Sequence, residues 1–279
     1  MSTKRVLCIQ DMSGIGRCSM AVSMPIISAM GVQCCPLATA LLSAHTGGFG
    51  AVAYMDETFY ALQALKHYKA QGLQFDAIYS GYLSDSEQVK LVQKAYEDNP
   101  NAIKILDTAM ADNGKLYSVL SSKLVDGMRE LCGKADIITP NITECLLLLG
   151  EDAALRKFTE KGLLTLAKRL LALGAKACVI KGALMADNVT VNVFFDGDEL
   201  ELINYNQIKG AYPGTGDVFA SVLAGSALQG ASFKQAAINA TLFATACVEA
   251  AKKQGDEARF GVPFEALLYT ITQKGQENA

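Results

Sequence analysis

Apolar residues follow two different spacings along this 279-residue chain, and the two spacings alternate from one end to the other. Short β-branched runs predict strands at Val6–Gln10, Val32–Leu42, Ala77–Ser80, Ile103–Asp107, Ile137–Thr139, Ala177–Lys181, Val189–Phe195 and Leu200–Tyr205. Longer stretches with helical spacing predict helices at Met20–Met30, Thr58–Gln71, Ser86–Tyr96, Tyr117–Cys132, Thr143–Leu149, Thr159–Leu173, Val218–Leu228 and Phe233–Lys253. This alternation favours an α/β fold, with a doubly wound, mostly parallel sheet and helices on both faces.

The last two predicted strands differ from the others, because Asp196-Gly197-Asp198 lies between them and is typical of a tight turn. They are expected to form an antiparallel hairpin at one edge of the sheet. No linker, repeat or low-complexity tract interrupts the chain. A single domain over residues 1–279 is therefore expected, since α/β domains reach about 250 residues.

Composition and charge narrow the classes of function. Apolar residues make up 51% of the chain and charged residues 19%, which is enough apolar material for a buried core. A formal net charge of -3 with interspersed signs gives no basic field, so nucleic acid is not an expected partner. No run approaches the roughly 20 apolar residues of a membrane span, and the apolar run Val6–Ile9 is too short for a signal peptide. A cytoplasmic location without membrane partners is expected.

The eight cysteines are scattered and form no C-x-x-C pair, while His45 and His67 stand far apart. Most of these thiols are expected to be reduced core residues, and no structural zinc site is expected. Whether Cys34 or Cys35 reacts is left open.

The segment Tyr212–Phe219 carries the tightest chemical signal in the chain. It reads Tyr-Pro-Gly-Thr-Gly-Asp-Val-Phe, a glycine-flanked turn that runs directly into an apolar helix beginning at Asp217. Backbone N–H groups in the first turn of a helix attract anions, and glycines let the backbone approach a ligand. A carboxylate at such a site suits catalysis: Asp217 would take the proton of an attacking hydroxyl while the amides of Thr215 and Gly216 stabilise a transferring phosphoryl group. An ordinary turn followed by an Asp helix cap is the alternative.

The segment GAYPGTGDVFASVLAGSALQG resembles the signature of the ribokinase-like superfamily of small-molecule kinases. The resemblance extends over essentially the whole chain and is closer to the pyridoxal kinases. On the acceptor side it rests on VLCIQDMSGIGRCS, SAHTG and SGYLSDSEQ. On the nucleotide side it rests on ILDTAMADNGKLY, ADIITPNITE and CVIKG.

This resemblance implies ATP-dependent phosphorylation of the 5′-hydroxymethyl group of pyridoxal, pyridoxine or pyridoxamine, with Mg²⁺ as cofactor, a requirement for a monovalent cation left open, and a homodimer as the assembly. It implies Asp217 as the general base and an anion hole at Gly214, Thr215 and Gly216. The residues implied to contact the acceptor, besides Asp217, are Asp11, Ser13, His45, Thr46 and Tyr82. Those implied to bind nucleotide, besides the anion hole, are Asp107, Asn141, Glu144, Lys181 and Asn239, with the metal near Asp107 and Glu144.

Each of these residues alone also fits a structural role. Ser13 and Thr46 suit turns, His45 suits a hydrogen-bonded core position, and Asn141 with Glu144 resembles a capped helix start. Two departures from the family pattern concern specificity. Asp11 stands where pyridoxal kinases usually have Ser, and the segment after Asp107 lacks the usual proline and glycine. Preference among the B6 forms is therefore left open.

Three other functions compete with a B6 kinase. Hydroxymethylpyrimidine kinases of thiamine synthesis share the expected fold but usually carry Cys where this chain has Asp217. The segment Gly14–Ser19 nearly spells the dinucleotide-binding fingerprint of oxidoreductases, but its sixth position is Ser, and no acidic residue falls near Cys34 and Cys35, where a ribose-binding carboxylate would stand. A non-catalytic protein with the kinase fold is the third alternative.

Overall fold

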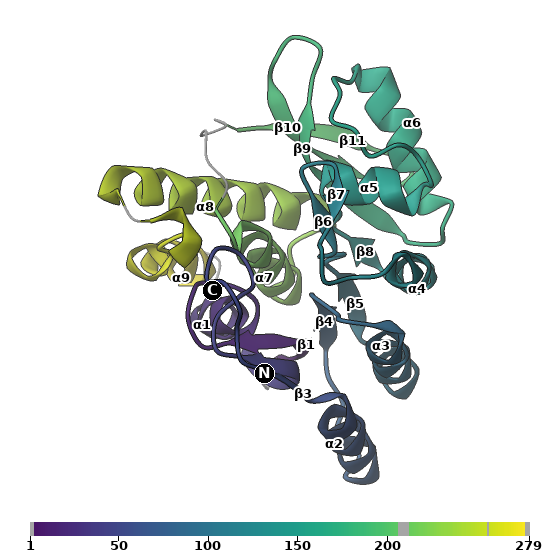
Figure 1. Ribbon diagram of the computed structural model, residues 1–279, viewed down its shortest axis with the longest axis vertical. Coiled ribbons are helices and arrows are strands. Elements are labelled where there is room, and N and C mark those ends of the chain that lie inside the picture. The colour runs from purple at the N-terminus through teal and green to yellow at the C-terminus, as the bar shows by residue number, and fades with distance from the viewer. Residues whose placement is uncertain (1–2, 206–211, 256, 277–279) are drawn as a thin grey trace. The chain divides into compact units, whose positions relative to one another are not determined.

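The computed structural model describes residues 3–205, 212–255 and 257–276, and the chain groups into two compact units. Unit 1 comprises Met1–Gly81 and Ile208–Ala279, and unit 2 comprises Tyr82–Gln207. Each unit has its own strands, helices and apolar core (Figure 1). The single domain over residues 1–279 stays a prediction. Residues 210 and 211, at the start of the kinase-like signature, lie outside the described residues.

Unit 1 is built on three parallel strands and one short antiparallel edge strand. Their order is β4 (Ala77–Ser80), β1 (Arg5–Ser13), β2 (Gln33–Leu42) and β3 (Tyr54–Asp56). The helices are α1 (Met20–Ala29), α2 (Thr58–Ala70), α7 (Thr215–Leu228), α8 (Phe233–Gln254) and α9 (Tyr269–Gln276), with 3-10 turns at Ala258–Phe260 and Glu265–Leu267. Helix α1 packs on β1 and β2, and α7 packs against both α1 and α8 (Figure 1).

Unit 2 contains three parallel strands followed by an antiparallel pair. Their order is β5 (Ile103–Leu106), β8 (Ile137–Ile138), β9 (Ala177–Leu184), β10 (Thr190–Phe195) and β11 (Leu200–Asn204). The helices are α3 (Ser86–Asp98), α4 (Ser122–Cys132), α5 (Ile142–Leu148) and α6 (Glu160–Leu171). A separate small hairpin pairs β6 (Ala111–Asp112) with β7 (Lys115–Leu116).

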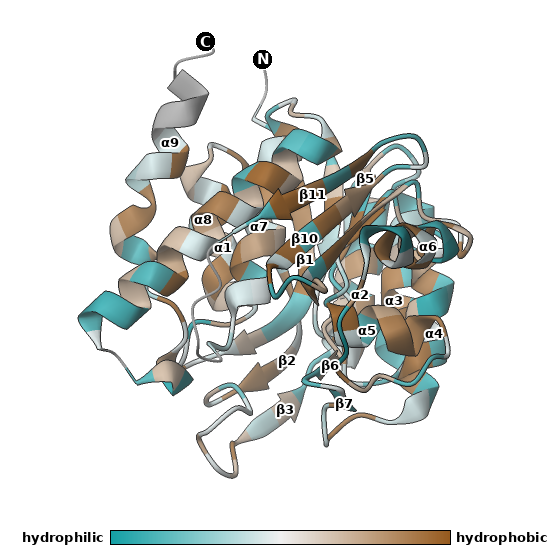
Figure 2. Cartoon of the chain, turned by 90° about the horizontal axis from the view of Figure 1, so that it is seen from above, coloured by the Kyte–Doolittle hydropathy of each residue, from teal (hydrophilic) through white to brown (hydrophobic). Residues whose placement is uncertain are grey.

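Burial explains why the apolar runs form strands in the interior. Every residue of β10 is buried, and Val6, Leu7 and Ile9 of β1 are fully enclosed. Figure 2 shows β10 mostly in brown, whereas α8 carries both hydrophobic and hydrophilic residues along its length. Removing these apolar side chains from water stabilises each core by about 25 cal/mol per Å² of apolar surface.

The predicted fold class is confirmed, including the mostly parallel strands and the antiparallel edge hairpin β10–β11. All eight predicted strands and all eight predicted helices are present, with ends shifted by a few residues. The largest shift is in α4, which begins at Ser122 rather than Tyr117 because the backbone of Ser121 is still extended. Strands β3, β6 and β7 and helix α9 were not predicted.

The eight cysteines are free thiols, six of them buried and Cys34 and Cys35 partly exposed. Among the described residues, no helix combines the length and the apolar character that crossing a membrane requires.

Candidate functional site

The turn that precedes α7 has a backbone that only glycine accommodates. Gly214 is the N-cap of α7 and has a left-handed φ of 79°. A Cβ atom at this position would lie 1.7 Å from the carbonyl oxygen of Arg17, so the absent side chain lets the two backbones touch. The Thr215 hydroxyl donates to the Tyr212 carbonyl at 2.8 Å and fastens the turn from the other side.

The first turn of α7 therefore begins without a side-chain cap. Gly214 has no side chain that could accept from the first-turn N–H groups, and the Thr215 N–H reaches the Tyr212 carbonyl only at 3.5 Å. These amides form the positive end of the helix dipole, which favours an anion at this position. The Asp217 carboxylate belongs to the same turn and is half-buried.

Asp11 lies in the same unit, at the end of β1, and is 5% exposed. Its carboxylate accepts hydrogen bonds from the hydroxyls of Ser13 at 2.9 Å and Ser19 at 2.5 Å. Burial raises the pKa of Asp11, and the two hydroxyls oppose that rise. Burial is also the main cause that raises the pKa of the Cys18 thiol, followed by the negative charges of Asp217 and Asp11. A Cβ on Gly214 would lie 3.4 Å from the Cα atom of Cys18, so the turn that precedes α7 adjoins the turn that follows β1.

Both ring nitrogens of His45 bond backbone groups of unit 1, and the ring packs edge-on against Phe49 with the centroids 5.0 Å apart. Its Nδ1 accepts a hydrogen bond from the N–H of Gly47 at 3.1 Å, which makes Nε2 the donor to the Arg259 carbonyl at 2.6 Å. A Cβ on Gly16 would lie 2.2 Å from the imidazole, so that turn packs directly on the ring. The imidazole thus fastens three loops, and both of its nitrogens are engaged. Thr46, the next residue, is exposed.

In unit 2, Asp107 follows strand β5 and forms a nearly buried ion pair with Lys181 of β9. Lys181 Nζ donates to Asp107 Oδ1 at 2.9 Å, and the two side chains are 15% and 4% exposed. The Thr139 hydroxyl, which follows β8, donates to the same oxygen at 3.2 Å. The carboxyl ends of parallel strands meet at one edge of a sheet, which explains how three segments distant in sequence supply this cluster.

Glu144 stands beside this ion pair and closes the start of α5. It forms a capping box with Asn141, in which each side chain bonds the other residue's backbone N–H at 2.9 Å. Its carboxylate also accepts from the hydroxyl of Thr108 at 2.9 Å and from the N–H of Met110 at 3.0 Å. Burial raises the pKa of Glu144 to about 7; the charge of Asp107 adds to this rise, and Lys181 and the backbone donors oppose it.

The predicted magnesium residues, Asp107 and Glu144, fit an ion held jointly with a bound nucleotide rather than an ion held by the protein alone. Among the described residues, no group of three or more His, Cys, Asp or Glu side chains is arranged to hold a metal. Asp107 and Glu144 supply two carboxylates, of which Glu144 is surrounded by hydrogen-bond donors. Magnesium usually takes one or two carboxylates and completes its shell with waters and substrate phosphates, and that chemistry suits this pair.

The two remaining predicted residues have less specific surroundings. Tyr82, the first residue of unit 2, is half-buried. Asn239 lies on α8, where its amide accepts from Gln235 at 3.1 Å and donates to Ser226 of α7 at 3.5 Å. Ser226 lies near the end of α7 remote from Gly214, so Asn239 is not part of the turn that carries Asp217.

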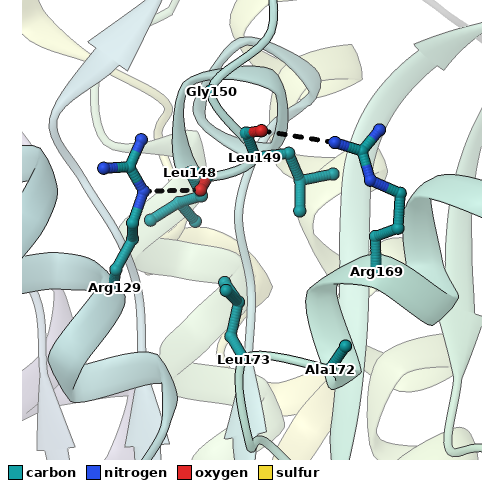
Figure 3. Close-up of a pocket in the computed structure, with 7 residues that line it drawn as sticks. All are labelled: Arg129, Leu148, Leu149, Gly150, Arg169, Ala172 and Leu173. Atoms are coloured by element: carbon teal, nitrogen blue, oxygen red, sulfur yellow. Dashed lines mark hydrogen bonds between the residues drawn. The ribbon is translucent and has the colours of Figure 1, made fainter.

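Each unit contains a cavity among its described residues. The cavity of unit 1, about 540 Å³, is bordered by Gly16, Arg17, Phe260 and Glu265, and thus adjoins the turn that touches Gly214. The cavity of unit 2, about 350 Å³, lies where α4, α5 and α6 end (Figure 3). There Arg129 donates to the Leu148 carbonyl at 2.7 Å and Arg169 to the Leu149 carbonyl at 3.3 Å, so both guanidinium groups cap α5, and no predicted site residue borders the space.

Several polar residues of these clusters were not predicted from the sequence. They are Cys18 and Ser19 in unit 1 and Thr108 and Thr139 in unit 2. Thr108 directly follows Asp107, and Thr139 ends a predicted strand, so their positions carried a weak signal. A small hydroxyl residue at a strand end is too common to be singled out without its neighbours.

Comparison with known proteins agrees with the resemblance seen in the sequence. The family model described as phosphomethylpyrimidine kinase matches residues 24–260. A candidate phosphomethylpyrimidine kinase from Bacteroides thetaiotaomicron is 33% identical, with a TM-score of 0.92 over 97% of this chain and 94% of that chain. An orthorhombic form of that protein was crystallised with pyridoxal. Pyridoxal kinase from Lactobacillus plantarum is 28% identical, with a TM-score of 0.90 over 99% of both chains. These likenesses confirm the predicted ribokinase-like fold.

Curated relatives match over shorter shares of their length. Hydroxymethylpyrimidine/phosphomethylpyrimidine kinase from Aquifex aeolicus (strain VF5) is 30% identical over 121 residues, which are 43% of this chain and 46% of the relative. The chain spans less than half the length of the curated relatives it matches.

Proposed function

Because the chain belongs to the phosphomethylpyrimidine kinase family, we propose that it transfers the γ-phosphoryl group of ATP to the 5′-hydroxymethyl group of a vitamin B6 form: pyridoxal, pyridoxine or pyridoxamine. The observation that supports this chemistry best is the first turn of α7. There a helix start without a side-chain cap and the Asp217 carboxylate share one turn behind Gly214. Family membership also favours a kinase over a dinucleotide-binding oxidoreductase.

In the proposed reaction, Asp217 acts as general base. The alcohol oxygen forms a bond to the γ-phosphorus, its proton passes to Asp217, and the bond from that phosphorus to the bridging oxygen breaks, so that ADP leaves with the electron pair. The N–H groups of Thr215 and Gly216 stabilise the charge on the transferring group. The residues proposed to surround the acceptor are Asp11, Ser13, His45, Thr46 and Tyr82. Because both ring nitrogens of His45 bond backbone groups, its proposed role is to hold the surrounding loops in place.

The cluster of unit 2 is proposed to serve the nucleotide. The positive charge of Lys181 would lie near the nucleotide phosphates. Asp107 and the phosphates would together hold Mg²⁺, and the bound ion would neutralise phosphate charge. Asn141 and Glu144 would hold the loop after Asp107 in place and contact the metal through water. Asn239 is proposed to approach the adenine.

The choice of acceptor rests on one residue and on the relatives. Asp217 stands where hydroxymethylpyrimidine kinases usually carry Cys. In addition, the 33% identical Bacteroides protein was crystallised with pyridoxal, and the 28% identical Lactobacillus protein is a pyridoxal kinase, both matching over nearly the whole chain. The family model and the curated relatives carry the name of the pyrimidine substrate, which makes hydroxymethylpyrimidine the second candidate.

The decisive experiment offers ATP with pyridoxal, pyridoxine, pyridoxamine or hydroxymethylpyrimidine in separate reactions and measures kcat/KM for each. A B6 form is expected to have the highest value. A higher value for hydroxymethylpyrimidine would transfer the assignment to thiamine synthesis. No phosphorylation of any acceptor would overturn the proposed function.

A homodimer is proposed as the assembly, because the pyridoxal kinases that the sequence resembles suggest one. Light scattering during size-exclusion chromatography measures the mass directly. A dimer near twice the chain mass of 29.7 kDa is expected, and a purely monomeric species would contradict it.

A further inference from the structure

Two serines of unit 1 are completely buried where α1 packs against α7. Ser23 of α1 and Ser221 of α7 are both 0% exposed, and each hydroxyl contacts the carbonyl four residues earlier in its own helix. The Ser221 hydroxyl donates to the carbonyl of Asp217 at 2.6 Å, and the Ser23 hydroxyl contacts the carbonyl of Ser19 at 3.1 Å. Ser221 thus contacts the backbone of Asp217, the residue assigned as general base, and Ser23 contacts the backbone of Ser19, the N-cap of α1.

The two hydroxyls also meet each other, with Ser221 Oγ and Ser23 Oγ 3.1 Å apart. The Gln10 side-chain amide of β1 donates to Ser23 Oγ at 2.6 Å. Farther along, the Ser19 hydroxyl donates to Asp11 at 2.5 Å. We call Asp11, Ser19, Ser23 and Ser221 the serine network, because their contacts run without a break from the acceptor-side carboxylate to the backbone of Asp217.

The backbone conformation of Ser19 is strained, which indicates that its surroundings hold it in place. Ser19 has φ 52° and ψ -128°, a conformation with positive φ that a side chain disfavours. Its hydroxyl is held by Asp11, and its carbonyl accepts from the N–H groups of Val22 and Ser23 at 3.0 Å each. A strained residue persists only where its surroundings hold it, and here the serine network supplies those surroundings.

Packing of α1 on α7 does not itself require polar side chains. Elsewhere in the same contact, Gly225 packs on Met30 so closely that a Cβ would lie 2.3 Å from its sulfur. A buried hydroxyl costs free energy unless it is hydrogen-bonded, and both serine hydroxyls here have partners. Ser221 lies four residues after Asp217, about one turn farther along α7, and Ser23 meets it from α1.

We propose that Ser23 and Ser221 are positioning residues for the phosphoryl transfer. Through the Asp217 carbonyl, they fix the first turn of α7 against the β1–α1 turn, so that the general base and the amides beside it keep one geometry toward the acceptor alcohol. This inference rests on the proposed kinase function and adds residues that touch neither substrate.

The test compares Ser221→Ala, Ser23→Ala and the double variant with wild type in the B6 kinase assay. Each single change is expected to lower kcat about 10- to 100-fold, since a misplacement of about 1 Å can cost that much, while the KM values for ATP and acceptor stay within about twofold. Because both serines act through one contact, the double variant is expected to lose no more than about twice the larger single loss.

Thr241→Val is the matched control. Thr241 is equally buried in a helix of the same unit and donates to the carbonyl of Ala237 four residues earlier, but it lies on α8. Its kcat is expected to stay within about twofold of wild type, with thermal stability measured for every variant.

Three results would overturn the inference: serine variants that keep wild-type kcat, losses equal to that of Thr241→Val, or losses that multiply in the double variant. A wild-type protein that phosphorylates no acceptor would overturn the proposed function and this inference with it. An active wild type with unaffected serine variants would overturn this inference alone. If Ser221→Ala does not fold, Ser23→Ala decides alone.

Discussion

Helices α5 and α7 each carry a carboxylate at the third position of the first turn, and the two carboxylates have opposite surroundings. In α5, Asn141 caps the helix and Glu144 completes the capping box, so the helix start satisfies itself. In α7, the cap is Gly214, which has no side chain, and Asp217 is half-buried. The same helix position therefore serves two purposes. A side-chain cap uses the amides to stabilise the fold, whereas a glycine cap leaves them for a ligand.

The most severe test of this contrast is Asp217→Asn. Asn keeps the shape of the side chain but does not accept the alcohol proton, so kcat is expected to fall by about 10²- to 10⁴-fold while the free energy of unfolding changes little. Steady-state kinetics with the best acceptor, together with urea unfolding, measure both quantities. A variant with nearly wild-type kcat would remove Asp217 from the role of general base.

The second prediction concerns the glycine cap, and compares Gly214→Ala with Gly230→Ala. Both glycines have positive φ, but a Cβ at position 230 meets no atom within 4 Å, whereas one at position 214 meets the Arg17 carbonyl. Gly230→Ala is expected to cost about 1–2 kcal/mol from backbone strain alone. Gly214→Ala is expected to cost about 2–5 kcal/mol and to lower kcat as well, because the turn must move away from Arg17.

Urea unfolding of both variants isolates the steric contribution, since the strain is common to the two positions. Equal losses of stability would mean that the close approach of Gly214 to Arg17 does not constrain the turn.

Much of the fold was predictable because burial and periodicity coincide in this chain. The eight predicted strands are runs of four to ten residues, apart from the two-residue β8, and most of them are largely buried. Strand β3 was missed because its three residues are all exposed and give no such run. The β6–β7 hairpin was missed although Asn113-Gly114 between its strands is a typical hairpin turn, and both residues have positive φ. There the signal was present, but two-residue strands are too short to show alternation.

The site was predictable only where a local motif carries the chemistry. The Gly-Thr-Gly-Asp segment places the amides and the carboxylate within four consecutive residues, so its geometry follows from the sequence. The contact between Ser23 and Ser221 joins residues 198 positions apart, and no spacing rule reaches that far. The hydrogen bond between His45 and the Arg259 carbonyl likewise joins residues 214 positions apart, whereas the bond from the Gly47 N–H is local.

The third prediction tests the buried ion pair of Lys181 and Asp107 in unit 2. Lys181→Met leaves Asp107 nearly buried without its partner and is expected to destabilise the fold by about 3 kcal/mol, since an uncompensated buried charge is costly. Lys176→Met is the matched control, because Lys176 pairs with Asp136 at 2.7 Å but is 77% exposed, and exposed pairs contribute about 0–1 kcal/mol. Similar losses in both variants, measured by urea unfolding, would mean that burial does not strengthen the Asp107–Lys181 pair. If Lys181 also serves the nucleotide, its loss raises the KM for ATP more than the KM for the acceptor.

The smallest expected effect is a pH dependence that comes from Glu144. Burial raises its pKa to about 7 in the folded protein, above its ordinary value of 4.5, so the folded state holds the proton more tightly than the unfolded chain. The contribution of this group to stability is therefore greatest below pH 4.5, declines as the pH rises toward 7, and is constant above that. Between about pH 5 and pH 8 the decline is on the order of 2 kcal/mol. Gln does not titrate, so Glu144→Gln is expected to lack this slope. It is also expected to be less stable overall, because its amide has one acceptor oxygen where both carboxylate oxygens accept bonds. Urea unfolding of both proteins across that pH range gives the difference directly. Parallel curves would mean that the donors around Glu144 keep it ionised throughout, and only the caps would then distinguish the two helix starts.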